Sequence, residues 1–114
     1  MFSKKGWKRR IITSSIEIEL ILKRGKRIET RWFRLILDPT DRGMERFVII
    51  VSRRFGKAVE RNRIKRRLRQ ILRKDVAIMS RSADMVIIPK PASLNEDFSV
   101  LQKAIHKTIT DTLV

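Results

Sequence analysis

The chain has 114 residues, the length of one ordinary domain, and 42% of them are hydrophobic, which is enough to build one core. Lys and Arg number 28 against 12 Asp and Glu, so the formal net charge is +16 and a polyanionic partner is expected. There is no Cys and only one His, which excludes disulfide scaffolds, thiolate zinc sites and Cys nucleophiles. We therefore expect no catalytic residue and no metal ligand in the chain itself.

The basic residues are concentrated in the first part of the chain. Residues 1–74 hold 24 basic and 7 acidic side chains, whereas residues 75–114 hold 4 basic and 5 acidic ones. The partner should therefore contact the first part. No apolar run reaches the roughly 18 residues of a membrane span, and no signal-peptide pattern follows the basic N-terminus. We expect an intracellular protein with no membrane partner.

A short amphipathic helix is expected over residues 14–24. Ser14 or Ser15 can cap its first turn, and Gly25 directly follows its last turn. Three apolar residues recur in it at helical spacing: Ile18, Ile21 and Leu22.

Two strands are expected at residues 30–38 and 45–53, because both segments are rich in branched and aromatic side chains. They should pair as a hairpin. The second segment contains the unbroken apolar run 47–51, which predicts a strand that is buried on both faces and central in the sheet. In the first segment, period-two alternation separates one face, which can be exposed to water, from an apolar one. The residues of the first face are Trp32, Arg34 and Ile36.

The rest of the chain predicts a helix, a strand and a final helix. The first helical pattern runs over residues 57–74 and can extend to residue 79, and residues 84–89 form an apolar strand that prolines end. Ser93 and Glu96 have the spacing of a capping box before the last helix. That helix carries an amphipathic stripe: Phe98, Leu101, Ile105, Ile109 and Thr112. The order helix, strand, strand, helix, strand, helix predicts an α+β fold in a single compact domain.

The strongest functional signal lies in residues 53–74, which hold eleven basic side chains and one acidic one. On a helix, its apolar residues fall within about 100° of arc and predict a core stripe. These residues are Ile64, Leu68, Ile71 and Leu72. A second arc on the far side holds Asn62, Lys65, Arg66, Arg69 and Arg73. Because the planar guanidinium of Arg donates to phosphate oxygens in pairs, this arc predicts a surface that binds nucleic acid.

Residues 55–70 closely resemble the signature of the bacterial ribonuclease P protein subunit. They read FGKAVERNRIKRRLRQ, and the hallmark is Arg-Asn-Arg on a helix, followed by Lys-Arg and a further Arg. The similarity extends to Val51-Ser52-Arg53-Arg54 before this segment, to the Gly25-Lys26 step and to Lys90-Pro91-Ala92-Ser93. It covers about residues 10–110.

The resemblance implies an α/β sandwich, that is, an α+β fold around a small mixed sheet. It further implies a left-handed βαβ crossover, although such crossovers are right-handed by default. It also implies an accessory subunit of an endoribonuclease. In that family the RNA subunit, which requires Mg²⁺, removes the 5′ leader from precursor tRNA, and we expect the protein to bind no cofactor. Residues 1–114 are then one RNA-binding domain, with residues 1–12 as a basic and partly flexible arm.

The implied partners are the ribonuclease P RNA and precursor tRNA, and not DNA. The basic helix 57–74 and the residues just before it are expected to bind the catalytic RNA. The residues concerned are Arg53, Arg54, Lys57, Arg61, Asn62, Arg63, Lys65, Arg66, Arg69 and Arg73.

A cleft between the helix 14–24 and the sheet is implied to hold the single-stranded leader. The corresponding residues are Ile18, Leu22, Trp32, Arg34 and Ile36. The family usually has Phe at positions 18 and 22 and often Tyr at position 36, so fewer stacking side chains are expected here. Trp32 can either stack on an unpaired base or belong to the core, and the sequence leaves both open.

A ribosomal or other structural RNA-binding protein is the alternative on composition. A DNA-binding protein is disfavoured, because the basic helix lies between strands and not in a helix-turn-helix or zipper context. The resemblance favours ribonuclease P and predicts the bacterial cytoplasm as the location.

Overall fold

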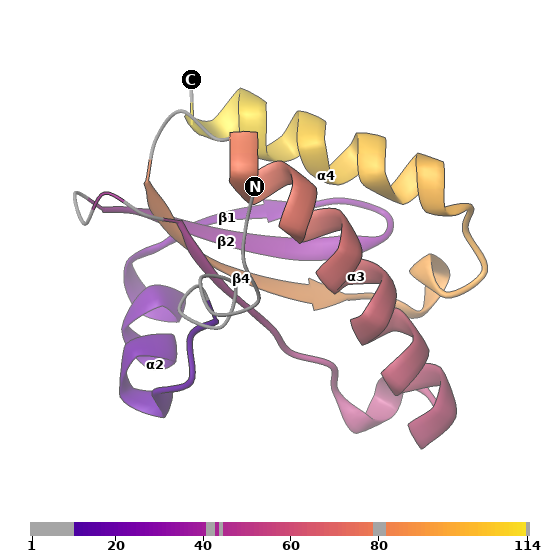
Figure 1. The fold of residues 1–114 in the computed structure, drawn as a ribbon. Helices are drawn as coiled ribbons and strands as arrows, with labels where there is room; N and C mark the ends of the chain where they lie inside the picture. Colours follow the sequence, from indigo (N-terminus) through magenta and orange to yellow (C-terminus); the bar gives the residue numbers. More distant parts are fainter. Residues whose placement is uncertain (1–10, 41–42, 44, 79–81, 114) are drawn as a thin grey trace.

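The computed structural model describes residues 11–40, 43, 45–78 and 82–113, with residues 75–78 and 113 described by their backbone only. The helices in this part of the chain are α2 (Ser15–Arg24), α3 (Ala58–Ile78) and α4 (Phe98–Leu113). The strands are β1 (Lys26–Glu29), β2 (Phe33–Pro39), β3 (Arg46–Ile49) and β4 (Ala83–Pro89), and the short 3-10 helices are η1 (Arg53–Phe55) and η2 (Pro91–Ser93) (Figure 1). None of these helices is long and apolar enough to cross a membrane.

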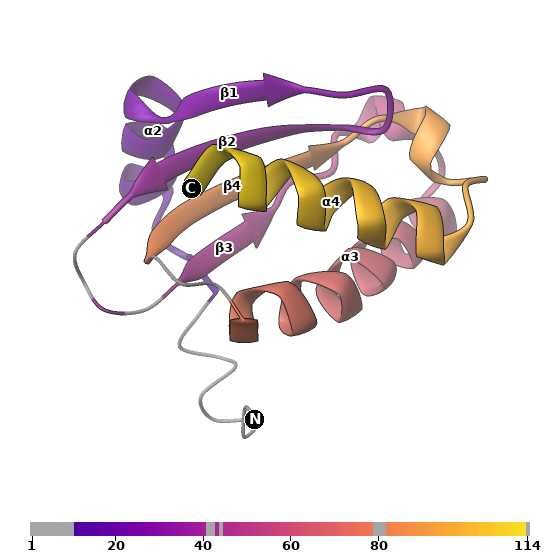
Figure 2. The same ribbon diagram turned by 90° about the horizontal axis from the view of Figure 1, so that it is seen from above.

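The strands form one sheet in the order β1-β2-β4-β3. β2 pairs antiparallel with both β1 and β4, whereas β3 runs parallel to β4 (Figure 2). The predicted hairpin between residues 30–38 and 45–53 is therefore wrong, because β4 lies between β2 and β3.

The predicted central position of the segment 45–53 is wrong as well. β3 ends at Ile49 and pairs with one of the described strands, β4, and Val48 and Ile49 are partly exposed. On its other side, the N–H of Ile12 donates to the carbonyl of Phe47 at 2.8 Å. Residues 1–10 of the expected basic arm lie outside the described residues. The central strand is β4, whose residues 83–87 are all buried. It has apolar side chains on both faces, which is the pattern that a central position requires.

The connection from β3 through α3 to β4 joins two adjacent parallel strands. When both strands point upward and α3 lies toward the viewer, the chain moves to the left, so the βαβ unit is left-handed (Figure 2). Right-handed crossovers prevail in almost all proteins. The implied crossover and the predicted α+β class, with a small mixed sheet, are confirmed.

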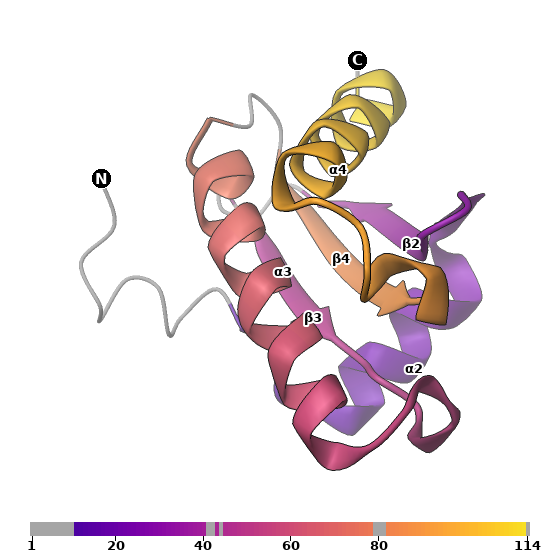
Figure 3. The same cartoon turned by 90° about the vertical axis from the view of Figure 1, so that its right-hand side faces the viewer.

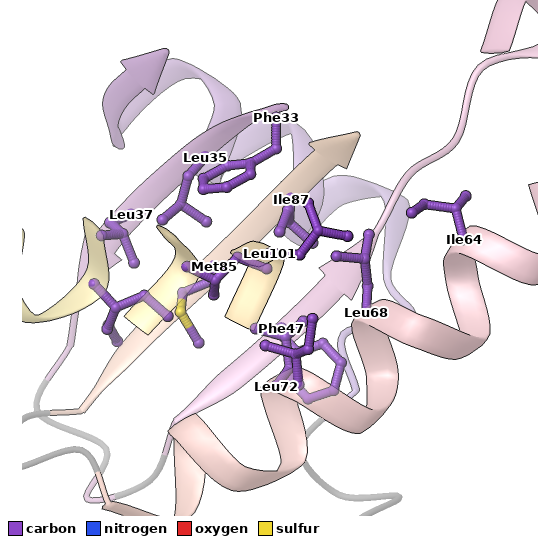
Figure 4. Packing of buried hydrophobic residues seen from close by; sticks show 14 of the residues in the cluster. Phe33, Leu35, Leu37, Phe47, Ile64, Leu68, Leu72, Met85, Ile87 and Leu101 are labelled. Carbon is purple, nitrogen blue, oxygen red and sulfur yellow. The ribbon is translucent and has the colours of Figure 1, made fainter. Parts of the chain in front are cut away.

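Two hydrophobic cores lie on opposite faces of the sheet. α3 and α4 cover one face and α2 covers part of the other (Figure 3). In the larger core, alternate residues of β2 and β4, such as Leu35 and Met85, meet the predicted stripes of α3 and α4 (Figure 4). Leu68 and Leu101 are at most 1% exposed. The smaller core, under α2, consists of Ile12, Ile21, Ile36 and Val86.

α2 leads directly into β1 through Gly25. The hydroxyl of Ser14 caps the helix by accepting from the N–H of Glu17 at 3.3 Å, which confirms the predicted start. A Cβ at position 25 would lie 2.3 Å from Cγ2 of Ile36, so only glycine lets the helix end approach β2. β1 itself is not predicted from the sequence, because its four residues contain a single apolar side chain.

The start of α4 differs from the predicted capping box. The helix begins at Phe98, and the buried hydroxyl of Ser93 instead donates to the carbonyl of Lys90 at 2.7 Å. Ser93 belongs to η2, which immediately follows β4. The hydroxyl of Ser93 therefore stabilises the turn before the helix and does not cap the helix itself.

A buried ion cluster ties α2 to the sheet. Arg46 of β3 donates to both carboxylate oxygens of Asp84 of β4, at 3.0 and 2.9 Å, and to Glu17 of α2 at 2.5 Å. The side chain of Asp84 is 3% exposed and that of Arg46 is 14% exposed. Hydrogen bonding to Asp84 raises the pKa of Arg46 above its already high value, so its guanidinium stays protonated.

We predict that Asp84→Ala lowers the free energy of unfolding by about 3 kcal/mol or more, because it leaves the half-buried Arg46 without its bidentate partner. Urea unfolding followed by circular dichroism measures this change. Glu29→Ala is the matched control, because it breaks the exposed pair with Arg34 and should have a much smaller effect. Equal losses for the two variants would contradict a structural role for the buried cluster.

Candidate nucleic-acid interface

α3 places apolar and basic residues on different sides of one helix. Its start is stabilised by Glu60, whose Oε1 accepts from the N–H of Lys57 at 2.9 Å. The predicted apolar stripe faces the sheet and is at most 1% exposed: Ile64, Leu68, Ile71 and Leu72. With this side packed, the remaining side chains of the helix are directed away from the core.

Most of the ten residues predicted to bind RNA lie on this outer side or just before the helix. We call the ten residues together the α3 basic surface. Eight of the ten are exposed: Arg53, Arg54, Lys57, Asn62, Arg63, Arg66, Arg69 and Arg73. Arg61 and Lys65 are half-buried. The surface therefore extends from η1 along about four turns of α3.

The α3 basic surface is poorly neutralised by the protein. Apart from Arg73, no member of the α3 basic surface makes an ion pair with another described residue; the ion pairs between described residues involve Arg24, Arg34, Arg46 and Lys90. Uncompensated guanidinium groups attract a polyanion and donate to its phosphate oxygens. The arrangement suits a nucleic-acid backbone.

Arg67 has a different role from its neighbours. Its Nη1 donates to the carbonyls of Leu94 and Glu96 at 3.3 and 3.0 Å, so it fixes α3 to the segment that precedes α4. Helical spacing already places Arg67 outside the basic arc, but its hydrogen-bond partners could not be predicted from the sequence. It stabilises the position of the basic helix.

Of the five residues predicted to bind a leader, all but Trp32 lie on the α2 side of the sheet. Ile18 and Leu22 are half-buried on α2, and Arg34 lies on the same face of the sheet, beside Glu29. Ile36 is 0% exposed beneath α2, so it has no surface with which to contact a ligand. Three partly exposed apolar residues next to α2 were not identified from the sequence: Val48, Ile50 and Ile88.

Trp32 lies on the opposite face from Ile36, contrary to the predicted alternation. It precedes β2 and packs against the larger core, next to α4, and its indole Nε1 donates to Glu96 at 3.1 Å. Residues outside a strand do not follow its period of two. Of the two roles that the sequence leaves open for Trp32, the structure supports the one in the core.

A small ionic network lies at the edge of the α2 side. Glu29 accepts from Arg34 and, at 2.6 Å, from Nζ of Lys90. Hydrogen bonds from Lys90 and then Arg34 lower the pKa of Glu29, so its carboxylate stays ionised. Among the described residues there is no group of three His, Cys, Asp or Glu that could hold a metal ion.

Comparison with known proteins connects this geometry with one family. The sequence model of the ribonuclease P family matches residues 7–112. The ribonuclease P protein component of Finegoldia magna is 38% identical over 89 residues, which cover 78% of each chain. That of Thermotoga maritima is 35% identical over 79 residues, covering 69% of this chain and 67% of the relative.

Solved structures agree with the fold. The ribonuclease P protein of Thermotoga maritima, in complex with 1-(4-fluorophenyl)-2-thiourea, superposes with a TM-score of 0.73 at 28% identity, covering 81% of this chain and 90% of that one. A Staphylococcus aureus ribonuclease P protein mutant superposes with a TM-score of 0.84 at 23% identity over 94% of this chain and 91% of that one. With the family model matching nearly the whole sequence, the chain belongs to the ribonuclease P protein family.

Proposed function

We propose that the chain is the protein component of a bacterial ribonuclease P and that it binds the catalytic RNA through the α3 basic surface. The observation that carries this proposal is the division of α3, which buries one apolar stripe and leaves basic side chains on its outer side. Each Lys or Arg that neutralises a phosphate releases bound counterions, which favours association. The family relationship selects ribonuclease P over the alternative of a ribosomal protein.

The proposed role of the protein is accessory. In the described residues, no acidic or His cluster is available to hold a metal, and the chain has no Cys to act as a nucleophile. The hydrolysis is then a reaction of the RNA subunit, which requires Mg²⁺. The protein supplies positive charge and a rigid surface in the bacterial cytoplasm, where precursor tRNA is processed.

We further propose that the leader of precursor tRNA lies along the α2 side of the sheet. The half-buried Ile18 and Leu22 and the partly exposed guanidinium of Arg34 are accessible there, whereas Ile36 lies beneath them. With Trp32 on the other face, this surface has no aromatic side chain among the residues named for it. Binding would depend on charge and apolar contact more than on base stacking.

The accessory role predicts that RNA-free protein does not cleave precursor tRNA in Mg²⁺. Adding a bacterial ribonuclease P RNA should give cleavage at the mature 5′ end, with a lower Mg²⁺ requirement than for the RNA alone, because the protein adds positive charge. Gel analysis of end-labelled precursor tRNA measures both results. Robust cleavage by protein freed of RNA by denaturation and refolding would contradict the accessory role.

The α3 basic surface predicts that Arg66→Ala with Arg69→Ala weakens binding of ribonuclease P RNA by at least about tenfold, or 1.4 kcal/mol. Its dependence on salt should also become less steep, because fewer counterions are released. Filter binding over a range of KCl concentrations measures both quantities. The fold should survive, since both side chains are exposed.

A matched control is Lys103→Gln with Lys107→Gln, which removes two exposed charges from α4. This variant should retain the affinity and the salt dependence of the natural sequence. If both pairs of substitutions weakened RNA binding equally, the α3 basic surface would not be the docking surface, and only the total charge would matter.

The proposed leader surface predicts that Leu22→Asp weakens binding of precursor tRNA to the reconstituted enzyme severalfold, while mature tRNA, which lacks the leader, binds as before. The new carboxylate would repel leader phosphates. Leu20→Asp is the control, because Leu20 lies two residues away on the outer side of α2 and is 43% exposed. Arg34→Gln is a second test that spares the packing of α2. Losses that are equal for both tRNAs would overturn the proposal.

A further inference from the structure

A groove lies between α4 and the turn that joins β1 to β2, away from the α3 basic surface. Its volume is about 550 Å³, which is in the range of sites that hold a ligand. It is lined mainly by Ile28, Trp32, Val100, Ala104, Lys107 and Thr108. Along α4 the lining residues recur every three or four positions, so the groove follows the helix for about three turns.

The uncharged polar side chains inside the groove are already satisfied. The hydroxyls of Thr108 and Thr112 donate to the carbonyls of Ala104 and Thr108, each at 2.7 Å. The hydroxyl of Thr30 bonds to the backbone of the β1–β2 turn, and the indole N–H of Trp32 bonds to Glu96. The groove therefore offers apolar contact and has few groups with which to read the edges of a base.

The groove is bordered by an open edge of the sheet. β1 pairs only with β2 among the described strands, and the N–H of Thr30 is directed to β2, where the carbonyl of Phe33 accepts it. In an antiparallel pair, inward and outward backbone groups alternate. The backbone groups of Arg27 and Glu29 consequently point outward, and the side chain of Ile28 between them lines the groove.

The charge around the groove is positive but modest. Lys26, Lys103 and Lys107 are exposed, and none of them makes an ion pair with another described residue. Asp111 is the acidic residue of the lining, and the nearby Glu29 is already paired with Arg34 and Lys90. An acidic ligand complements these lysines.

We propose that this groove binds an extended acidic peptide of a partner protein, which adds to β1 as a fifth strand and places alternate apolar side chains against α4. Strand addition beside a helix provides backbone hydrogen bonds for affinity and a groove for specificity. A second copy of this chain fits poorly, because its formal net charge is also +16. RNA fits poorly because the uncharged polar groups of the groove, which could read the edges of a base, are internally bonded.

The test uses the full chain, freed of RNA, and a fluorescein-labelled peptide of alternating Glu and Val residues. Fluorescence anisotropy should detect binding. A peptide of the same composition with Glu and Val in separate blocks should bind at least tenfold more weakly, because its Val side chains do not share one face. Two further versions of the alternating peptide, one N-methylated at its Val residues and one at its Glu residues, test the contribution of backbone hydrogen bonds to binding. One of the two should lose binding.

Two protein variants locate the site. Lys103→Glu with Lys107→Glu should weaken binding of the alternating peptide at least tenfold. Arg27→Pro removes an outward N–H and leaves the pairing with β2 intact, so it should also weaken binding. Arg66→Ala with Arg69→Ala should leave the affinity of this peptide unchanged. These variants distinguish the groove from the α3 basic surface, so the result does not depend on the proposed function in ribonuclease P.

Several results would overturn the proposal. Equal binding of the alternating and block peptides, or unchanged binding to both groove variants, would show attraction by charge alone. If oligouridylate displaced the peptide, and if its own binding required Lys103 and Lys107, the groove would be assigned to RNA. Sedimentation that detects a dimer of the natural chain, lost in the Lys103→Glu and Lys107→Glu variant, would assign it to a second copy.

Discussion

The pairing of β4 on both of its sides is the constraint on which the other elements depend. β4 lies between β2 and β3, and its residues 83–87 are all buried. Met85 and Ile87 contribute to the core beneath α3 and α4, while Val86 contributes to the core beneath α2. Asp84, at the start of the same strand, holds Arg46 and through it Glu17. One strand therefore joins both cores and helps to orient α2, α3 and α4.

This arrangement gives α3 a fixed position from which to present its charge. Like charges along one helix repel each other and lower its stability, so a helix as basic as α3 needs other support. Its stripe packs against the sheet, and Arg67 bonds to two carbonyls before α4. Because the apolar stripe and Arg67 hold the helix in place, most of its other guanidinium groups remain available for phosphate. In this way, tertiary packing stabilises the surface that we propose binds RNA.

The two faces of the sheet offer different chemistry. The α2 side carries half-buried apolar residues and an ionic network around Glu29, next to exposed basic residues such as Arg27. The α4 side has an apolar groove whose polar groups are internally bonded. A protein with a formal net charge of +16 thus has one surface where apolar side chains predominate and only a few lysines add positive charge. That contrast makes a protein ligand, and not RNA, the better occupant of the groove beside α4.

The helices, their apolar stripes and the basic arc of α3 could be predicted from the sequence, because a period of 3.6 residues is a local property of the chain. The same holds for the existence of β2, β3 and β4. The order of the strands was decided only by tertiary structure. β4 begins forty-four residues after β2 ends at Pro39, yet it pairs with β2 in preference to the nearer β3. The side on which Trp32 lies and the burial of Ile36 also depended on that structure, since the first residue precedes the strand and the second is covered by α2. Strand pairing and the covering of a face join residues far apart in the chain, and no local pattern specifies them.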